Sequence, residues 1–292
     1  MDRAALAMEV RRLEFRTRKR VEDLFVGHYL SAFKGRGIEF AEVREYQPGD
    51  DTRTIDWNVT ARTGRPHIKR FIEERELTVM IAADISPSGD FGSQSHTKRE
   101  LIIDIAAAMA MTASLNRDRC GLMLFSDHVE RMIRPGKGSR HTQRILRELL
   151  TIRPQGRGTS IATAVDTLGR VLKRRALVLL MTDFIDSGFE RSLRSLARRH
   201  EVVALHILDP REREATAAGL VTLEDPETGR TWLVDLSSGG SRRAYAQGAS
   251  EEEAFVRRIC AQARVERVAL TTGRPFMPEI VRYFSARGGR RR

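Results

Sequence analysis

The chain has 292 residues, and 41% of them are hydrophobic, so it can fill the core of one large α/β domain or of one domain with a smaller appendage. No apolar run approaches the roughly 20 residues that a membrane-spanning helix needs, and the first residues lack the apolar centre of a signal peptide. We therefore expect a cytoplasmic protein without a membrane span.

The cysteines and histidines limit the metal chemistry. Cys120 and Cys260 are the only two cysteines and show no CxxC spacing, which excludes a thiolate zinc site and a disulfide scaffold. We expect both to be small buried side chains. The seven histidines are scattered and include no HExxH motif, so a histidine metal site is not favoured either.

The formal net charge is +12, and much of it is concentrated in one stretch. Residues 131–175 hold twelve Lys or Arg and two acids, a net charge of about +10, and five more Arg follow Glu279. Such a surface could attract nucleic acid, anionic lipid or an acidic protein. Because no aromatic residue lies within 131–175 to stack on bases, nucleic-acid binding is kept only as an alternative.

The first 76 residues predict a helix followed by a β-rich segment. Residues 3–25 carry apolar side chains at the spacing of an amphipathic helix, namely Leu6, Val10, Leu13, Val21 and Leu24. From 35 to 76 the pattern changes to short extended pieces and turns, with Asp50 or Asp51 as the cap of a short helix. Alternating charges there predict an internal ion-pair network, anchored by the apolar side chains of Phe40, Tyr46, Ile55 and Trp57.

From residue 77 onward, predicted strands alternate with predicted helices. The strands are expected at 77–83, 120–127, 176–181, 201–208 and 265–271, and the helices at 97–116, 140–150, 160–174, 189–199, 239–264 and 275–286. Residues 128–134 look like an antiparallel mate of the second strand, and 220–235 like a hairpin with its turn at 225–229. His206 is expected to be a satisfied residue of the core or of a strand end.

This alternation predicts an α/β fold with a mostly parallel, doubly wound, Rossmann-type sheet, an N-terminal helix and a small β-rich segment. We expect residues 1–76 to form the helix and the β-rich segment, and 77–210 to form the core. Residues 211–292 are expected to complete the domain with a hairpin, a strand and helices.

The stretch 77–88, LTVMIAADISPS, is a buried strand that ends in oxygen-bearing side chains. Asp84, Ser86 and Ser88 stand at i, i+2 and i+4, so a loop could aim all three at one point. Carboxylate and hydroxyl oxygens suit a hard cation such as Mg²⁺, with Mn²⁺ or Ca²⁺ as alternatives. A polar turn with Ser88 or Ser93 as a helix cap explains the same residues without a metal.

Two further oxygen-bearing side chains come from distant loops. Asp183 also ends a predicted strand, and Thr159 begins a predicted helix after a Gly-rich loop. Ligands of wound sheets gather at the carboxyl ends of the strands. The candidate cation site therefore consists of Asp84, Ser86, Ser88, Thr159 and Asp183.

This set resembles the metal-ion-dependent adhesion site of von Willebrand factor type A domains. Within that superfamily, the chain also resembles the bacterial family called domain of unknown function 58 over roughly residues 35–208. The elements that carry this second resemblance are Gly35-Arg36-Gly37-Ile38-Glu39-Phe40, Arg44-Glu45-Tyr46, Pro48-Gly49-Asp50-Asp51, Arg53, Ile55-Asp56-Trp57, Ala61-Arg62, Phe91-Gly92-Ser93 and Thr182-Asp183-Phe184.

The resemblance implies that the five candidate ligands hold a divalent cation, some of them through water, and that a partner's carboxylate completes the shell. It also implies an adaptor or chaperone-like role beside a MoxR-type AAA+ ATPase, or with another acidic protein. We accordingly expect a non-catalytic protein-interaction module, because no GxSxG elbow, Walker loop or GxGxxG motif is present. The enzyme alternative is a metal-dependent phosphohydrolase with Asp127 or Asp186 as its general base.

Overall fold

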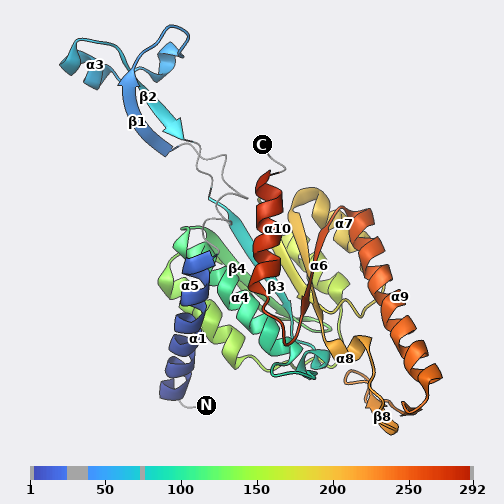
Figure 1. Ribbon diagram of the computed structural model, residues 1–292. Helices are drawn as coiled ribbons and strands as arrows, with labels where there is room; N and C mark the ends of the chain where they lie inside the picture. The colour runs from blue at the N-terminus through green and yellow to red at the C-terminus, as the bar shows by residue number, and fades with distance from the viewer. Residues whose placement is uncertain (1–2, 25–38, 73–75, 290–292) are drawn as a thin grey trace.

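A computed structural model describes residues 3–24, 39–72 and 76–289 (Figure 1). Three parts of the predictions lie outside these residues: Gly35–Ile38 of the family signature, Glu74 and Arg75 of the ion-pair network, and the last three Arg of the tail. Within the described part, no helix is both long enough and apolar enough to cross a membrane.

The centre of the molecule is a six-stranded sheet with the strand order β10-β7-β6-β3-β4-β5. All neighbours pair in parallel except β4 and β5, which are antiparallel. The strands are β3 (Thr78–Asp84), β4 (Arg119–Phe125), β5 (Val129–Gly136), β6 (Leu177–Thr182), β7 (Glu201–Leu208) and β10 (Glu266–Thr271). The predicted α/β fold with a mostly parallel sheet is therefore confirmed.

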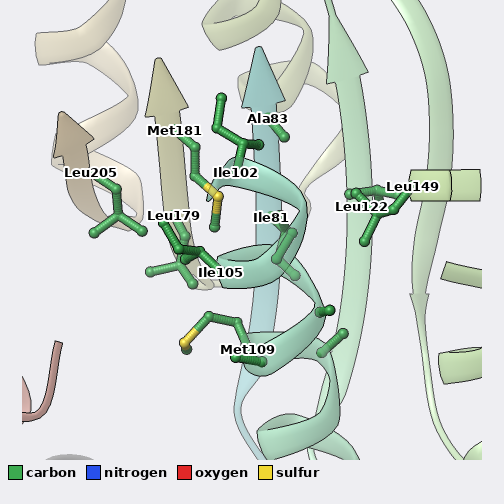
Figure 2. Packing of buried hydrophobic residues seen from close by; sticks show 14 of the residues in the cluster. Ile81, Ala83, Ile102, Ile105, Met109, Leu122, Leu149, Leu179, Met181 and Leu205 are labelled. Carbon is green, nitrogen blue, oxygen red and sulfur yellow. The ribbon is translucent and has the colours of Figure 1, made fainter. Parts of the chain in front are cut away.

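Helices cover both faces of this sheet, and each face has its own apolar cluster. The first cluster lies under α1 (Arg3–Leu24), α4 (Lys98–Leu115), α5 (Ser139–Thr151) and α10 (Met277–Gly289). The second lies under α6 (Ile161–Val171), α7 (Glu190–Arg199) and α9 (Gly239–Ala263). Along β3 the side chains alternate: Ile81 and Ala83 join the first cluster, whereas Met80 and Ala82 join the second. Figure 2 shows Ile102, Ile105 and Met109 of α4 packed over the sheet.

The N-terminal helix packs against the core through three of the five residues predicted to line its apolar face, and the side chains of the other two, Val21 and Leu24, lie outside the described part of the structure. Val10 and Leu13 are buried in the first cluster, Leu6 packs against it, and Arg16 forms a 2.5 Å ion pair with Asp104 of α4. Cys120, Cys260 and His206 are buried, as predicted. His206 is satisfied, because its Nδ1 accepts a hydrogen bond from Arg267 at 2.9 Å. The proposed boundaries after residues 76 and 210 stay predictions.

The β-rich segment is an antiparallel pair, β1 (Glu39–Glu45) with β2 (His67–Ile72), which Figure 1 draws apart from the central sheet. Asp51 caps η1 (Thr52–Thr54), as predicted. The sequence did not predict α3 (Trp57–Thr63), which Asp56 caps. Of the predicted ion-pair network, Arg44 contacts Asp50 at 2.7 Å. Trp57 was predicted to be an apolar anchor, but it is 70% exposed because it begins the short helix α3 beside a hairpin of only two strands.

The predicted hairpin after the core is β8 (Leu220–Glu224) with β9 (Thr231–Asp235). It follows the short helix α8 (Pro210–Arg213). Helix α4, the first α-helix after β3, is capped by Thr97, whose side chain accepts from the backbone N–H of Glu100 while the Glu100 side chain accepts from the backbone N–H of Thr97. Ser88 and Ser93 are therefore not the caps of α4, and the prediction that one of them caps this helix is wrong.

Asp209 joins three segments that meet at the end of β7. Its carboxylate is fully buried and accepts hydrogen bonds from Ser93, Thr272 and Arg211. Burial raises the pKa of this carboxyl, but the hydrogen bonds outweigh burial and hold the pKa below its usual value. The carboxylate form is therefore the one that stabilises the fold.

Asp209→Ala should lower the free energy of unfolding by about 3 kcal/mol at pH 7, because four donors on Ser93, Arg211 and Thr272 lose a charged acceptor. A lowered folded pKa contributes stability that is present above the unfolded value of about 3.9 and is lost as pH falls through the folded value. The difference from wild type should therefore shrink below about pH 4 in urea titrations. Asp235→Ala, which alters an exposed turn, is the control and should change stability far less. An equal effect of both variants would contradict this role.

Candidate metal centre

Asp84 is the last residue of β3, and its carboxylate is fixed on both sides. Oδ1 accepts from the backbone N–H of Ser86 at 2.8 Å, and Oδ2 accepts from the hydroxyl of Thr182 at 2.7 Å. The residue is 4% exposed. Because β3 and β6 are neighbours, the carboxylate sits where these two parallel strands end.

The two serines continue the site from the turn that follows. Ser86 precedes the short helix η2 (Pro87–Asp90), and Pro87 in its first position fixes the entry into that turn. The Ser86 and Ser88 hydroxyl oxygens lie 3.1 Å apart, and Ser88 donates to Oδ2 of Asp183 at 2.9 Å. Asp84, Ser86, Ser88 and Asp183, which come from the ends of two strands, thus form one continuous set of oxygen-bearing side chains.

These four side chains line a small cavity of about 10 Å³, together with Gly89, Lys98, Ile102 and Ile207. That volume is about the space of one water-sized sphere. A single ion or water is therefore the largest group that this cavity can hold.

Lys98, in the first turn of α4, is a member of the site that we did not predict. Its ammonium is buried and contacts Asp183 at 2.8 Å and Glu212 at 2.5 Å. Burial lowers the pKa of Lys98, but the two carboxylates outweigh burial and raise it above its usual value. The sequence did carry a signal, since Lys98 stands three and four residues before the buried Leu101 and Ile102, on the apolar stripe of the helix.

The balance of buried charge favours a cation near Asp84. Burial, and after it the negative charge of Asp183, raise the pKa of Asp84 to about 7. Burial also raises the pKa of Asp183, but Lys98 outweighs it and holds this pKa below its usual value. The ammonium of Lys98 pairs with Asp183 and Glu212, and together with Asp84 these four groups carry a net charge of −2 when all are ionised. A divalent cation would relieve the repulsion that Asp84 experiences.

Thr159 is brought to the same end of the sheet by a loop that two carboxylates hold in place. Glu130 accepts from the backbone N–H groups of Gln155 and Gly156 at 2.8 Å each, and Asp127 accepts from that of Arg157 at 3.3 Å. A side chain at Gly156 would lie 2.2 Å from the hydroxyl of Ser126, so this close approach requires glycine. The loop is therefore a fixed support for Thr159.

The hydroxyl of Thr159 does not contact the other four candidates. It donates to Oε1 of Glu227, in the turn between β8 and β9, at 2.6 Å. The structure thus brings Asp84, Ser86, Ser88 and Asp183 together directly and connects Thr159 to a carboxylate that we did not predict. Glu227 follows Asp225-Pro226 in a turn, and that pattern alone gave no reason to select it.

The oxygen atoms present fit a hard cation. Two carboxylates and two hydroxyls surround a space of the right size, and each is a ligand type that Mg²⁺ accepts. In the described part of the chain, no group of three or more His, Cys, Asp or Glu side chains is arranged to hold a metal. The hydroxyls are therefore essential to this candidate site.

Asp183 also lines a second, larger pocket. It has a volume of about 420 Å³, and its lining combines Phe184, Ile185 and Phe255 with His206 and Glu252. Phe184 has a φ of 60°, a left-handed conformation that is costly for a residue with a side chain. This conformation directly follows Asp183, so the backbone is strained where the pocket and the candidate ligand meet.

The two carboxylates that could act as general bases are engaged in holding loops. Asp127 contacts His128 at 2.5 Å as well as the backbone of Arg157. Asp186 accepts from the backbone N–H groups of Ile161 at 2.8 Å and Ser187 at 2.7 Å. Both side chains therefore have structural tasks, and neither contacts Asp84 or Asp183 through a hydrogen bond recorded among the described residues.

Comparison with known proteins gives one family match and several uncharacterised relatives. The matching family model is described as protein of unknown function DUF58 and spans residues 42–255. An uncharacterized protein of Mycobacterium tuberculosis H37Rv is 34% identical over 98% of this chain and 91% of its own length. An uncharacterized protein of Mycobacterium avium is also 34% identical, over 52% of this chain and 92% of its own length.

Solved structures show weaker similarity. The conserved hypothetical protein BatB from Bacteroides thetaiotaomicron has a TM-score of 0.47 and 17% identity, over 73% of this chain and 99% of that one. The SpRpn10 VWA domain has a TM-score of 0.41 and 12% identity, over 72% of this chain and 95% of that one. The strand order of the central sheet is therefore what defines the fold.

Proposed function

Because this chain belongs to the DUF58 family, and because its candidate ligands meet at one end of the sheet, we propose that it is a non-catalytic module that docks a protein partner through a divalent cation. Mg²⁺ is the proposed ion, with Mn²⁺ or Ca²⁺ as alternatives. Asp84, Ser86, Ser88 and Asp183 would hold it, with Thr159 beside them. The observation that carries the proposal is the continuous contact between Ser86, Ser88 and Asp183 around a cavity of one-ion size.

Docking suits this site better than catalysis does. A hydrolytic metal site needs a general base that can reach the attacking water. The two candidate bases, Asp127 and Asp186, accept backbone hydrogen bonds from neighbouring loops instead. A cation held by few protein carboxylates can accept another one, and the pocket beside Asp183 gives a partner's side chain room to approach.

The proposed partner is a MoxR-type AAA+ ATPase, or another protein that presents an acidic residue. This choice comes from the resemblance of the site and of the family signature. The net charge of +12 supports it, because a basic surface attracts an acidic protein before the two make contact.

Removal of the metal should separate the two proteins. We expect the immobilised chain to capture a MoxR-type ATPase in Mg²⁺, to lose at least about tenfold in affinity in EDTA, and to recover when Mg²⁺ is restored. EDTA also removes Mg²⁺ from the ATPase, so the loss of capture in EDTA does not by itself locate the metal. The decisive measurement is therefore capture by the Asp84→Ala variant in excess Mg²⁺, and this variant should capture no ATPase. Asp235→Ala, on an exposed turn, should bind like the wild type.

Capture that survives both EDTA and Asp84→Ala would place the interaction on another surface. In that case the basic stretch 131–175 becomes the candidate binding surface, and nucleic acid is the first ligand to test on it. Binding of nucleic acid would weaken steeply with salt and would be unaffected by Asp84→Ala.

A further inference from the structure

The pocket of about 420 Å³ is lined by the loop after β6, the end of β7, and helices α8 and α9. Helix α8 lies beside α9, as Figure 1 shows. Pockets that bind ligands commonly measure about 300–1,000 Å³, and in wound sheets they lie at the carboxyl ends of the strands. This pocket meets both conditions, and it can hold a whole side chain of another molecule.

Carboxylates dominate the charge of this pocket, although the whole chain carries a formal net charge of +12. The lining holds five carboxylates and one guanidinium, namely those of Asp183, Asp186, Glu212, Glu252, Glu253 and Arg213. His206 adds no positive charge near pH 7, because burial, and after it the charge of Arg267, lower its pKa to about 4. The pocket is therefore a negative region on a positive protein, and it attracts cations.

Internal cations already pair with three of the five carboxylates. Lys98 contacts Asp183 at 2.8 Å and Glu212 at 2.5 Å. Arg213 contacts Glu253 at 2.7 Å. Two carboxylates of the lining are thus left without a cationic partner in the part of the chain that the structure describes.

These two carboxylates belong to Asp186, in the loop after β6, and to Glu252, on α9. Asp186 accepts hydrogen bonds from the backbone N–H groups of Ile161 and Ser187, which carry no charge. The side chain of Glu252 has no hydrogen bond or ion pair among the described residues. Partial burial, and after it the charge of Asp183, raise the pKa of Glu252. A cation in the pocket would relieve this repulsion.

Aromatic and aliphatic side chains make up most of the remaining lining, namely Phe184, Ile185, Leu208, Phe255 and Val256. Arginine suits such walls better than lysine does, because its planar guanidinium stacks on aromatic rings and bonds to carboxylates through several N–H groups. The ring of Phe255 already has one guanidinium, that of Arg258, at 5.5 Å from its centre. Ile185 is 55% exposed, so it offers the stem of an arginine an apolar contact.

We propose that this pocket binds an arginine side chain of a partner protein, and that Asp186 and Glu252 receive its guanidinium. The inference goes beyond the proposed function, because the arginine occupies a different cavity and needs no metal ion. Asp183 lines both cavities, but its charge is already paired with Lys98. The pocket thus selects partners by a basic residue, whether or not a cation is bound beside it.

Titration of the full-length protein with acetyl-Ala-Arg-Ala-amide in EDTA, followed through backbone amide NMR shifts, tests this assignment. The peptide should shift the amides of Ile185, Glu252 and Phe255 in a saturable way. A peptide with citrulline in place of arginine keeps the shape but carries no charge, and it should leave these amides unshifted. A peptide with leucine at this position should also fail to bind. The affinity for the arginine peptide should fall as NaCl is added.

Glu252→Gln should weaken binding of the arginine peptide at least about fivefold, because a charge-assisted hydrogen bond is lost. Glu251→Gln is the matched control: it removes the same charge from the neighbouring exposed residue of α9, which does not line the pocket. This control should bind the arginine peptide like the wild type. Equal melting temperatures of the two variants would show that both are folded.

Several outcomes would overturn the inference. Equal shifts with the arginine and leucine peptides would make the pocket an apolar groove, and wild-type affinity in Glu252→Gln would remove the guanidinium from this carboxylate. Self-association of the wild type that the arginine peptide disperses would assign the pocket to a second copy of the chain. Arginine-peptide binding by a protein that binds no Mg²⁺ would support this inference and contradict the proposed function alone.

Discussion

Asp84→Ala should abolish the Mg²⁺-dependent rise in melting temperature that we expect of the wild-type protein. A ligand at 100 times its dissociation constant stabilises the folded state by about 2.7 kcal/mol. At roughly 2–4 °C per kcal/mol, the wild-type midpoint should rise by about 5–10 °C, and that of the variant should not move. Asp84 carries this effect because its buried carboxylate has Asp183, and not a lysine, as its main charged neighbour.

Asp84→Asn is the control for loss of shape. Asparagine keeps the size of the side chain and can still accept from the backbone N–H of Ser86, but it removes the charge that repels Asp183. In EDTA this variant should therefore melt at or above the wild-type temperature, while its response to Mg²⁺ should be absent. A Mg²⁺ response of wild-type size in either Asp84 variant would mean that the ion binds elsewhere.

Lys98→Met should produce the largest loss of stability among the variants of this site. It removes the ammonium that lies between Asp183 and Glu212 and leaves both carboxylates without it. Loss of one member of a buried ion pair costs about 3–5 kcal/mol, because the remaining charge stays buried. Urea unfolding in EDTA should show a loss of this size.

Two further measurements and one control test whether the loss of stability comes from the buried charges around Lys98. Glu212→Gln added to Lys98→Met should recover part of the loss, since one of the two stranded charges is gone. Mg²⁺ should also reduce the loss, because a cation beside Asp183 replaces part of the missing positive charge. Lys137→Met, which breaks an ion pair between more exposed partners, should stay within about 1 kcal/mol of the wild type. If Lys98→Met behaves like Lys137→Met, the ammonium does not hold this site together.

Much of the core could be predicted because its signals are local. A short apolar stretch such as 176–181 is typical of a strand covered on both faces, and β6 spans Leu177–Thr182. The hairpin at 220–235 was likewise predicted from its turn residues. Helix α3 was missed because its seven residues give too short a pattern. Trp57 was misplaced because its exposure depends on what packs beside it, and the described residues leave it 70% exposed.

The candidate site likewise has one part that the sequence predicted and another that it did not. The sequence by itself determined which oxygen-bearing residues end strands β3 and β6, because a carboxylate that ends an apolar run can be recognised without knowing what lies beside it. Only the tertiary structure decided their partners: Lys98 beside Asp183, and Glu227 on Thr159. Such contacts join residues 85 and 68 positions apart, and they depend on how helices and hairpins are placed on the sheet, which no local pattern specifies.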